Sequence, residues 1–254
     1  MHKYFANSLF LGKKSIYLPE CHSTNGEAME LVRKESGNHG TLIHTDYQTQ
    51  GRGQKGNVWL SEPKENLLFS LILKLDFIEV SQAYMLNIMT CLALRDVASR
   101  MLANGQVEIK WPNDIYVKGK KVAGILVETV LRGKLVDYAV IGVGLNVNQT
   151  HFSLANVTSF SIEKNDSFSR NAVMDRLLKS LEHYYLMLRG LKFNFLLKLY
   201  HENLMWRNEL HSFQLANGEM IEGKISGIDH HGRLIIRHGD LIKHYETKQV
   251  LFIE

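Results

Sequence analysis

The chain has 254 residues, which is enough for one large domain or for one domain with a small appendage. Hydrophobic residues make up 45% of it, and no stretch of 18 apolar residues occurs, so we expect no membrane-spanning helix. The formal net charge of +4 is compatible with a phosphate-bearing ligand but gives little support for a DNA-binding stripe. The N-terminus lacks the order of a signal peptide, and the two cysteines show no metal-ligand spacing. We therefore expect a cytoplasmic protein.

The first 75 residues predict short strands around one helix. The first expected strand is residues 15–18, and the almost continuously apolar run at 66–73 predicts a buried strand. Between them, Thr24 and Glu27 stand three residues apart, which is the spacing of a capping box at a helix start. A further short strand is expected at residues 41–43.

The central part predicts one long helix followed by a β-meander. Apolar residues repeat at steps of three and four from Ser81 to Asn104, and Gly105 is expected as the C-cap. Short glycine-containing turns then join closely spaced apolar segments, which indicates antiparallel pairing. The expected strands are Val107–Lys110, Asp114–Val117, Val122–Val130 and Leu135–Val143.

Two helices and a series of hairpins complete the chain. Ser169 is a candidate N-cap for the first helix, and the second is expected from Lys192 to Met205. From His211 onward, short strands alternate with turns at 217–218, 231–232 and 238–239. This pattern predicts a small β-barrel, so we divide the chain into a main domain, residues 1–209, and a C-terminal domain, residues 210–254.

The glycine loop at residues 51–56 fits the spacing G-x-G-x-x-G of dinucleotide-binding motifs. That motif works where a helix leaves it, because the helix N-terminus then faces the pyrophosphate. Here Pro63 would break such a helix in its third turn, which argues against this interpretation. Glycines also let a backbone approach a ligand closely, and Arg52 and Lys55 add two cations. From these residues alone, an anion-binding flap and a solvated surface loop both remain open.

The segment Lys110–Asp114 lies between two predicted strands. Pro112 stiffens it, and Asn113 and Asp114 are ordinary turn residues, so a simple β-turn would explain it. The same residues could instead handle a nucleotide, since Asp114 could hold Mg²⁺ and Lys110 could meet a phosphate.

Two more segments place glycines or a lysine beside apolar strands. Lys121 immediately precedes such a strand, so of the lysines around it this one is best placed to point inward. Gly124 leaves room for a ligand over the sheet. The two glycines in residues 142–148 indicate either a close backbone approach or a bulge at a strand end.

Together, these segments resemble the biotin–protein ligases, also called biotin–acetyl-CoA-carboxylase ligases. The resemblance implies an α+β fold in which helices pack on a mixed, largely antiparallel sheet, as in class II aminoacyl-tRNA synthetases, followed by an SH3-like barrel. It also implies a two-step reaction through biotinyl-5′-adenylate, with MgATP and biotin as substrates and a biotin carboxyl carrier protein domain as acceptor. The matching segments occur in the family's order over about residues 20–150 and are Ser23-Thr24-Asn25, Gln48 followed by GRGQKGNVW, KWPND, KKVAGILVE and GVGLNVN.

The resemblance also implies roles for individual residues. Lys121 and Arg52 would be the catalytic cations, and Asp114 would hold Mg²⁺ with ATP. The biotin-binding residues would be Ser23, Thr24, Asn25, Gln48, Gly51, Arg52, Gly53, Gln54, Lys121 and Gly124. The nucleotide-binding residues would be Arg52, Lys55, Trp59, Lys110, Asn113, Asp114 and Asn146.

The chain differs from the family pattern in two ways, and one alternative function remains. Gln54 stands where many relatives carry a basic residue, so we expect the adenylate to leak faster than from an all-arginine loop. The matching motifs begin about twenty residues in, which leaves no room for an N-terminal winged helix, so no DNA partner is expected. The rival is a lipoate or octanoate ligase or transferase on the same fold, whose Arg-Arg-x-Ser-Gly-Gly-Gly loop is absent here. The sequence does not determine the oligomeric state, and a homodimer is possible.

Overall fold

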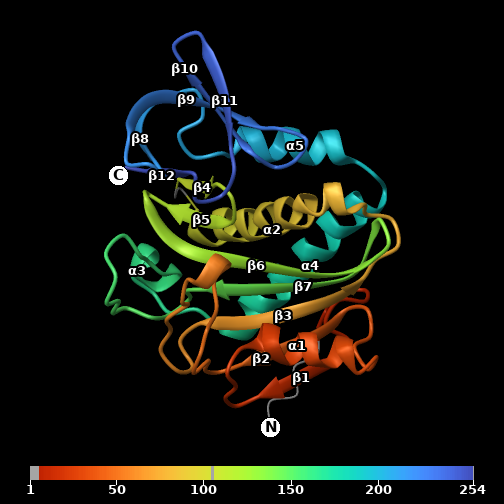
Figure 1. Cartoon of the computed structure of the whole chain (residues 1–254). Coiled ribbons are helices and arrows are strands. Elements are labelled where there is room, and N and C mark those ends of the chain that lie inside the picture. The colour runs from red at the N-terminus through yellow and green to blue at the C-terminus, as the bar shows by residue number, and fades with distance from the viewer. Residues whose placement is uncertain (1–5, 104–105, 254) are drawn as a thin grey trace.

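A seven-stranded sheet forms the centre of the protein in the computed structural model, which describes residues 6–103 and 106–253, apart from the side chain of Lys55 (Figure 1). The strand order is β1-β2-β3-β7-β6-β5-β4, and only β1 and β2 run parallel. The sheet is therefore mixed and largely antiparallel, as predicted. Its strands are β1 (Ser15–Leu18), β2 (Thr41–Thr45), β3 (Leu67–Lys74), β4 (Val107–Lys110), β5 (Asp114–Val117), β6 (Lys120–Arg132) and β7 (Leu135–Leu145).

Helices cover both faces of this sheet (Figure 1). Alternate residues of β3 point to opposite sides. Phe69 and Leu71 join the large core under α2 (Tyr84–Leu102) and α4 (Arg170–Arg189), whereas Ile72 packs with α1 (Thr24–Arg33) in a smaller core. The face covered by α1 has the smaller core, and it is the face that carries the candidate site.

Helix boundaries correct several expectations. The long helix begins at Tyr84, not Ser81, because Val80–Gln82 forms a separate 3-10 turn. Its predicted end at Asn104 and the Gly105 cap lie outside the described residues. The side chain of Ser169 accepts a hydrogen bond from the Ala172 amide, so this predicted N-cap is confirmed.

The predicted capping box at α1 is wrong. The N-cap is Ser23, whose side chain makes no cap hydrogen bond, and Thr24 is already the first helical residue. The Thr24 amide instead donates to the Gln48 side chain at 2.8 Å, so the helix start is built around the candidate site. Farther along, α5 (Phe193–Glu202) ends three residues before the predicted Met205, and the five-residue α3 (Phe160–Lys164) was not predicted.

A second, five-stranded sheet follows and lies beside α5 and β4 (Figure 1). Its order is β11-β10-β9-β8-β12, and all its pairs are antiparallel with turns at the predicted positions. The division into domains at residues 209 and 210 stays a prediction. The strands are β8 (Leu210–Leu215), β9 (Met220–Ile228), β10 (Leu234–His238), β11 (Leu241–Tyr245) and β12 (Val250–Phe252).

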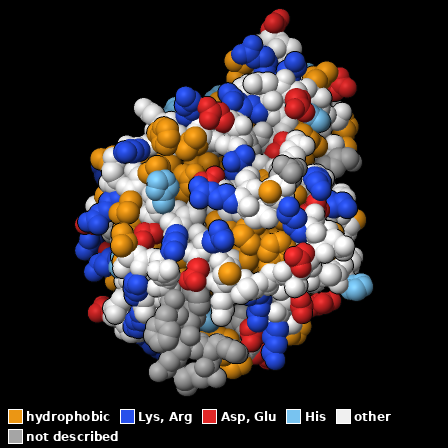
Figure 2. All heavy atoms as spheres, turned by 180° about the vertical axis from the view of Figure 1, so that it is seen from behind, with side chains coloured by type: hydrophobic (Ala, Val, Ile, Leu, Met, Phe, Trp, Pro, Cys, Tyr) orange, Lys and Arg blue, Asp and Glu red, His pale blue; other side chains and the backbone are white. Residues whose placement is uncertain are grey.

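The helices and the surface of the protein show the apolar and charged character expected from the sequence. Within the described residues, no helix is both long and apolar enough to cross a bilayer. On the face seen in Figure 2, Lys and Arg side chains are interspersed with Asp and Glu, and hydrophobic side chains lie between them.

Candidate active site

A cavity of about 300 Å³ lies on the α1 face of the large sheet. The strand register explains why so many of the candidate residues meet there. Lys110 pairs with Asp114, Asp114 with Gly124, and Gly124 with Gly144. These four residues form one row across β4, β5, β6 and β7. Paired residues of neighbouring strands point to the same side of a sheet, so the row is one edge of the cavity floor.

The cavity floor contains glycines because side chains of other segments pack directly against its backbone. A Cβ atom on Gly142 would collide with the Asn25 side chain, and one on Gly144 would collide with the Trp59 indole. A Cβ on Gly124 would lie 2.9 Å from the same indole. The sequence left two interpretations of residues 142–148, a close backbone approach or a bulge at a strand end. Both Gly142 and Gly144 are approached closely by a side chain, so the first interpretation holds.

One end of the cavity, which we call the amide end, is lined by Thr24, Asn25 and Gln48 and backed by Ser70, which contacts Thr24 and Asn25. The Ser70 hydroxyl lies 2.8 Å from the Thr24 hydroxyl and 2.6 Å from Oδ1 of the Asn25 side chain. The Gln48 side-chain oxygen accepts from the Thr24 amide and hydroxyl. Thr24, Asn25 and Ser70 are buried, so these neutral groups are held rigidly by their own hydrogen bonds.

The opposite end, which we call the lysine end, is formed by Lys110, Asp114 and Lys121. The Lys121 ammonium donates to Asp114 Oδ2 at 2.7 Å. Lys121 would point away from Gly124 in a regular strand, since the two residues are an odd number of positions apart. A register shift between Ile115 and Tyr116 pairs Tyr116 with Lys121 and so turns the lysine to the cavity side.

The one carboxyl group of the lysine end is partly buried, since the Asp114 side chain is 23% exposed. Burial raises the pKa of Asp114 above its ordinary value, and the neighbouring Lys121 ammonium offsets only part of this shift. The Lys110 ammonium lies 4.7 Å from the centre of the Tyr116 ring and 5.2 Å from that of Phe252. Aromatic rings from both sheets therefore lie beside this ammonium group.

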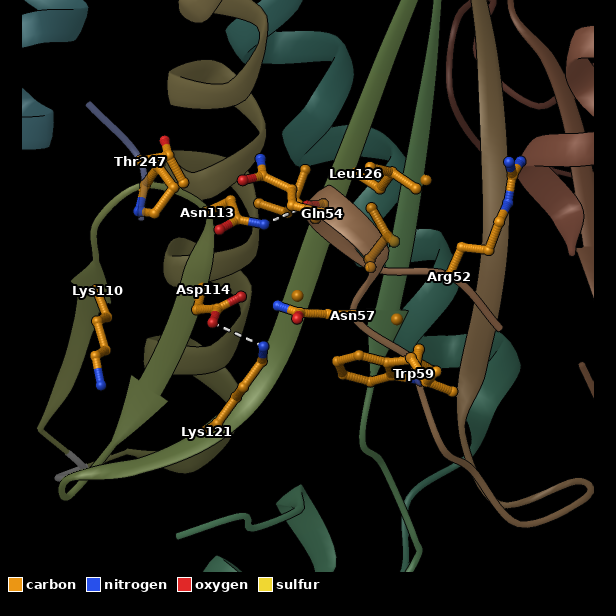
Figure 3. Close-up of a pocket in the computed structure, with 18 of the residues that line it drawn as sticks. Arg52, Gln54, Asn57, Trp59, Lys110, Asn113, Asp114, Lys121, Leu126 and Thr247 are labelled. Atoms are coloured by element: carbon orange, nitrogen blue, oxygen red, sulfur yellow. Dashed lines mark hydrogen bonds and ion pairs between the residues drawn. The ribbon is translucent and has the colours of Figure 1, made fainter. Parts of the chain in front are cut away.

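Arg52 points away from the lysine end (Figure 3). Its guanidinium lies 3.4 Å from the Glu128 carboxylate, and the same carboxylate oxygen accepts from the Asn25 amide at 2.8 Å. Glu128 therefore connects the glycine loop to the start of α1. The Arg52 side chain is 47% exposed, so this contact is a weak surface ion pair.

The glycine loop folds back on itself beside the floor. The Gly53 amide donates to the Asn57 carbonyl, and the Trp59 amide donates to the Gly51 carbonyl. The Trp59 indole lies over Gly124 and Gly144, with the Lys121 ammonium 5.6 Å from its ring centre. Its Nε1–H is buried and has no protein partner among the described residues. A ligand acceptor could pair with it.

Most of the predicted site residues line the cavity, but two of the described ones do not. Asn146 is 2% exposed and donates to the Thr158 carbonyl at 3.0 Å, so the structure does not bring it to the cavity. Gly51 packs behind the Trp59 backbone. The Lys55 side chain lies outside the described residues. The predicted residues that do line it are Ser23, Thr24, Asn25, Gln48, Arg52, Gly53, Gln54, Trp59, Lys110, Asn113, Asp114, Lys121 and Gly124.

Sequence reasoning missed two groups of residues around the cavity. Ser70 and Glu128 lie within predicted strands, where nothing local distinguishes them from other polar strand residues. The second group comes from the C-terminal sheet and includes Thr247, Lys248 and Phe252. Only the packing of the two sheets brings these residues to the site, so no motif could have revealed them.

Comparison with known proteins identifies the family. The family model "Biotin/lipoate A/B protein ligase family" matches residues 18–146, which is just over half of the chain. The chain belongs to the biotin/lipoate A/B protein ligase family. This membership confirms the resemblance drawn from the sequence motifs, which lie in the same part of the chain.

Several members of this family are similar to the chain over most of its length. The bifunctional ligase/repressor BirA of Bacillus subtilis is 31% identical over 238 residues, which cover 92% of this chain and 72% of that protein. BirA of Bacillus spizizenii is 33% identical over 180 residues, which cover 69% of this chain and 54% of that protein. The chain thus spans between about half and three quarters of these relatives.

A solved structure confirms the fold class. The biotin protein ligase of Aquifex aeolicus, in complex with biotin and ATP, superimposes with a TM-score of 0.77 at 25% identity. The match covers 94% of this chain and 98% of that one, so it includes both sheets.

Proposed function

We propose that the chain is a biotin–protein ligase, which activates biotin with MgATP and transfers it to a lysine of a biotin carrier domain. The observation that carries this proposal is the pairing of two unlike ends in one cavity. The amide end offers neutral hydrogen-bonding groups, whereas the lysine end offers two ammonium groups and one carboxylate. The Aquifex aeolicus relative, which holds biotin and ATP together, supports the same assignment.

The amide end suits the ureido ring of biotin. Ser23, Thr24 and Gln48 present hydroxyl and amide groups at the wall of the cavity, and Asn25 is locked behind them by Ser70. Each polar atom of the ring needs a partner, because a buried unpaired group costs about 1–3 kcal/mol. Thr24, Asn25 and Gln48 are already held by hydrogen bonds, so biotin binding would cost little side-chain conformational entropy.

The lysine end suits adenylate formation. A biotin carboxylate oxygen attacks the α-phosphorus of ATP, the bond from that phosphorus to its bridging oxygen breaks, and pyrophosphate leaves. Two anions must approach each other, so positive charge beside them lowers the barrier. Lys121 is fixed by Asp114 for this role, and Arg52 can exchange its loose contact with Glu128 for the reacting anions.

Magnesium would accompany the ATP phosphates. Asp114 is the sole carboxylate among the described residues that line the cavity. Its Oδ2 holds Lys121, and its Oδ1 faces Gly124. Mg²⁺ in nucleotide sites is bound through one or two carboxylates together with phosphate oxygens, so this donor set fits. When bound, the ion supplies neutralising charge, and Asp114 orients Lys121 beside it.

The second step transfers the acyl group. The ε-amine of a carrier lysine attacks the acyl carbon of the adenylate, the bond from that carbon to the phosphate oxygen breaks, and AMP leaves as the amine loses a proton. The glycine loop covers this bond and excludes water until the carrier arrives. The Trp59 indole, whose N–H has no protein partner among the described residues, would pack on the adenine.

The cysteines bear on the cellular setting. Cys21 and Cys91 are both free thiols, which supports a reducing, cytoplasmic setting.

The test measures transfer directly. Purified protein is given labelled biotin, MgATP and a biotin carrier domain, with lipoate and octanoate as competing acids. We expect label on the carrier that excess lipoate or octanoate does not reduce. Transfer of lipoate or octanoate in preference to biotin would instead assign the chain to the rival activity within the same family.

A further inference from the structure

The buried carboxylate of Asp229 holds residues of the C-terminal sheet together near the contact with the large sheet. The Asp229 side chain is 4% exposed. Its Oδ1 accepts from the amides of His231 and Arg233 at 2.9 and 3.0 Å. Its Oδ2 accepts from Arg233 Nε at 2.8 Å and lies 2.7 Å from His244 Nδ1. Burial raises the pKa of Asp229, but these hydrogen bonds outweigh it and hold the pKa well below its ordinary value.

The first group fixed by Asp229 is the turn between β9 and β10, residues 229–233. At its tip, the Gly232 carbonyl accepts from Trp111 Nε1 at 2.9 Å. Gly232 has a φ of +79°, and a Cβ there would lie 2.8 Å from Tyr84, so only glycine fits this approach. Trp111 is 6% exposed and lines the cavity just before Asn113 and Asp114.

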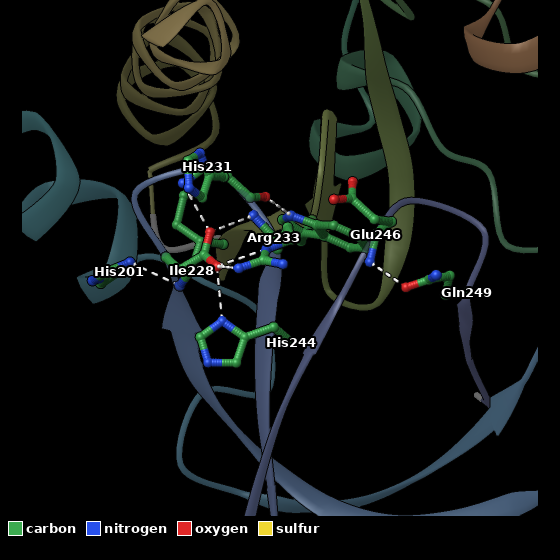
Figure 4. A network of polar contacts seen from close by, with 10 residues as sticks. His201, Ile228, His231, Arg233, His244, Glu246 and Gln249 are labelled. Carbon is green, nitrogen blue, oxygen red and sulfur yellow. Dashed lines mark hydrogen bonds and ion pairs between the residues drawn. The ribbon is translucent and has the colours of Figure 1, made fainter. Parts of the chain in front are cut away.

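The second group is the turn between β11 and β12, residues 246–249. His244 pairs with Asp229 from β11, and the chain enters this turn two residues later. The turn is closed by the Glu246 amide on the Gln249 side chain at 2.7 Å (Figure 4). Thr247 and Lys248 at its tip line the cavity, and Thr247 lies near Asn113 (Figure 3).

Both connections arrive at the same side of the cavity. Trp111 follows Lys110 of the lysine end in the chain, and Thr247 lies near Asn113, which precedes Asp114 (Figure 3). At the amide end, the hydrogen bonds of Ser70 and Asn25 run to Thr24, Leu126 and Glu128 and to one another. A change at Asp229 should therefore be felt by a ligand with phosphates and not by one held through the amide end.

We propose that Asp229 is a positioning residue for the nucleotide. It holds the Gly232 carbonyl against Trp111 and, through His244, holds the Thr247–Lys248 turn at the cavity, so the C-terminal sheet completes the ATP side of the site. This inference rests on the proposed function, because it assumes that ATP occupies the lysine end.

The test measures dissociation constants of ATP and biotin separately, by calorimetry on the full chain. Asp229→Asn keeps the size of the side chain but turns two donors toward the surrounding N–H groups. We expect the Kd for ATP to rise about tenfold and the Kd for biotin to change by less than about twofold. Glu219→Gln, an exposed carboxylate of the same sheet, is the matched control and should change neither constant.

A double-mutant cycle distinguishes positioning from general loss of structure. Trp111→Phe removes the indole N–H that reaches Gly232, together with part of the ring, and keeps an aromatic side chain at the cavity wall. If the two residues act along one connection, Asp229→Asn combined with Trp111→Phe weakens ATP binding by less than the product of the single effects. Independent, multiplicative effects, unchanged ATP binding in Asp229→Asn, or an equal loss of biotin binding would each overturn the proposal.

Two further variants cover a folding failure of Asp229→Asn. Trp111→Phe and His244→Gln each cut one connection and leave the carboxylate in place, and both must then weaken ATP binding. Unchanged ATP binding in either variant would overturn the proposal. A wild-type protein that binds ATP but forms no biotinyl adenylate would contradict the proposed function and not this inference, since the binding constants require no turnover.

Discussion

The two ends of the cavity differ in how they are held. At the amide end, Thr24, Asn25 and Ser70 are buried and satisfy one another through short hydrogen bonds. At the lysine end, the Lys121 side chain is 29% exposed and its order depends on one carboxylate, Asp114. The first arrangement is rigid before any ligand arrives, whereas the second can change partners.

This difference matches what each end has to do. A neutral ring is recognised by fixed donors and acceptors, and a misplaced one is costly because it stays unpaired. Reacting phosphates change their charge distribution during the reaction, so ammonium groups that can follow the charge are useful. We therefore expect changes at the amide end to affect biotin binding and changes at the lysine end to affect the rate of adenylate formation.

The largest effect is expected for Lys121→Ala. Loss of its ammonium removes charge at the reacting phosphorus, so adenylate formation should slow by about 10²–10³-fold. Biotin binding should change far less, because the amide end is intact. Single-turnover formation of labelled biotinyl-AMP measures the rate. Lys120→Ala, the exposed neighbour, is the control, and a similar loss in both variants would show that Lys121 has no special role.

A smaller effect, on the other end, is expected for Ser70→Ala. The hydroxyl lies against both Thr24 and Asn25, so its removal leaves two buried polar groups less well fixed. The Kd for biotin should rise about tenfold while the Kd for ATP stays the same. Ser36→Ala, an exposed serine after α1, serves as the control. Equal weakening of both ligands would erase the distinction between the two ends.

Acid should affect the lysine end selectively. Burial raises the pKa of Asp114, so this carboxylate takes up a proton at a higher pH than an ordinary aspartate, whose pKa is about 3.9. The folded chain then binds more protons than the unfolded one, and the contribution of Asp114 to stability falls as the pH rises through that range. We expect an acid limb in kcat/KM for ATP but a flat Kd for biotin. Persistence of the limb in Asp114→Asn would contradict this assignment.

The smallest effect on activity is expected for Glu182→Gln, which lies outside both ends. The buried Glu182 carboxylate accepts from the amides of Leu9, Phe10 and Leu11 and so fixes the N-terminal segment on α4. Its loss should lower the free energy of unfolding by about 2 kcal/mol. Thermal denaturation measures this change, and both ligand constants should stay unchanged. An altered Kd for biotin or ATP would show that the site is coupled to this segment.

The sequence predicted most strands because their patterns are local. The apolar run of β3 and the glycine turns of the meander specify extended, paired backbone without knowledge of distant residues. The short α3 was missed because five residues offer too few turns for a helical repeat. The capping box at Thr24 failed because tertiary contacts with Gln48 and Ser70 engage the Thr24 hydroxyl.

The candidate site was predictable only where motifs mark it. Lys121 and Asp114 stand in recognisable segments, yet the bulge that aims Lys121 at the cavity is a property of the strand register. Asn146 shares a motif with the cavity glycines, but β7 ends at Leu145, and beyond that end the Asn146 side chain turns to the Thr158 carbonyl. Thr247 and Asp229 act across the contact of two sheets, which no local pattern records.

The central claim is that this cavity joins the carboxylate of biotin to the α-phosphorus of ATP. Exchange of labelled pyrophosphate into ATP tests it most directly, because the exchange requires a reversible adenylate and no carrier domain. The account predicts exchange that depends on biotin and magnesium and is nearly lost in Lys121→Ala. Folded protein that binds both ligands but catalyses no biotin-dependent exchange would contradict it.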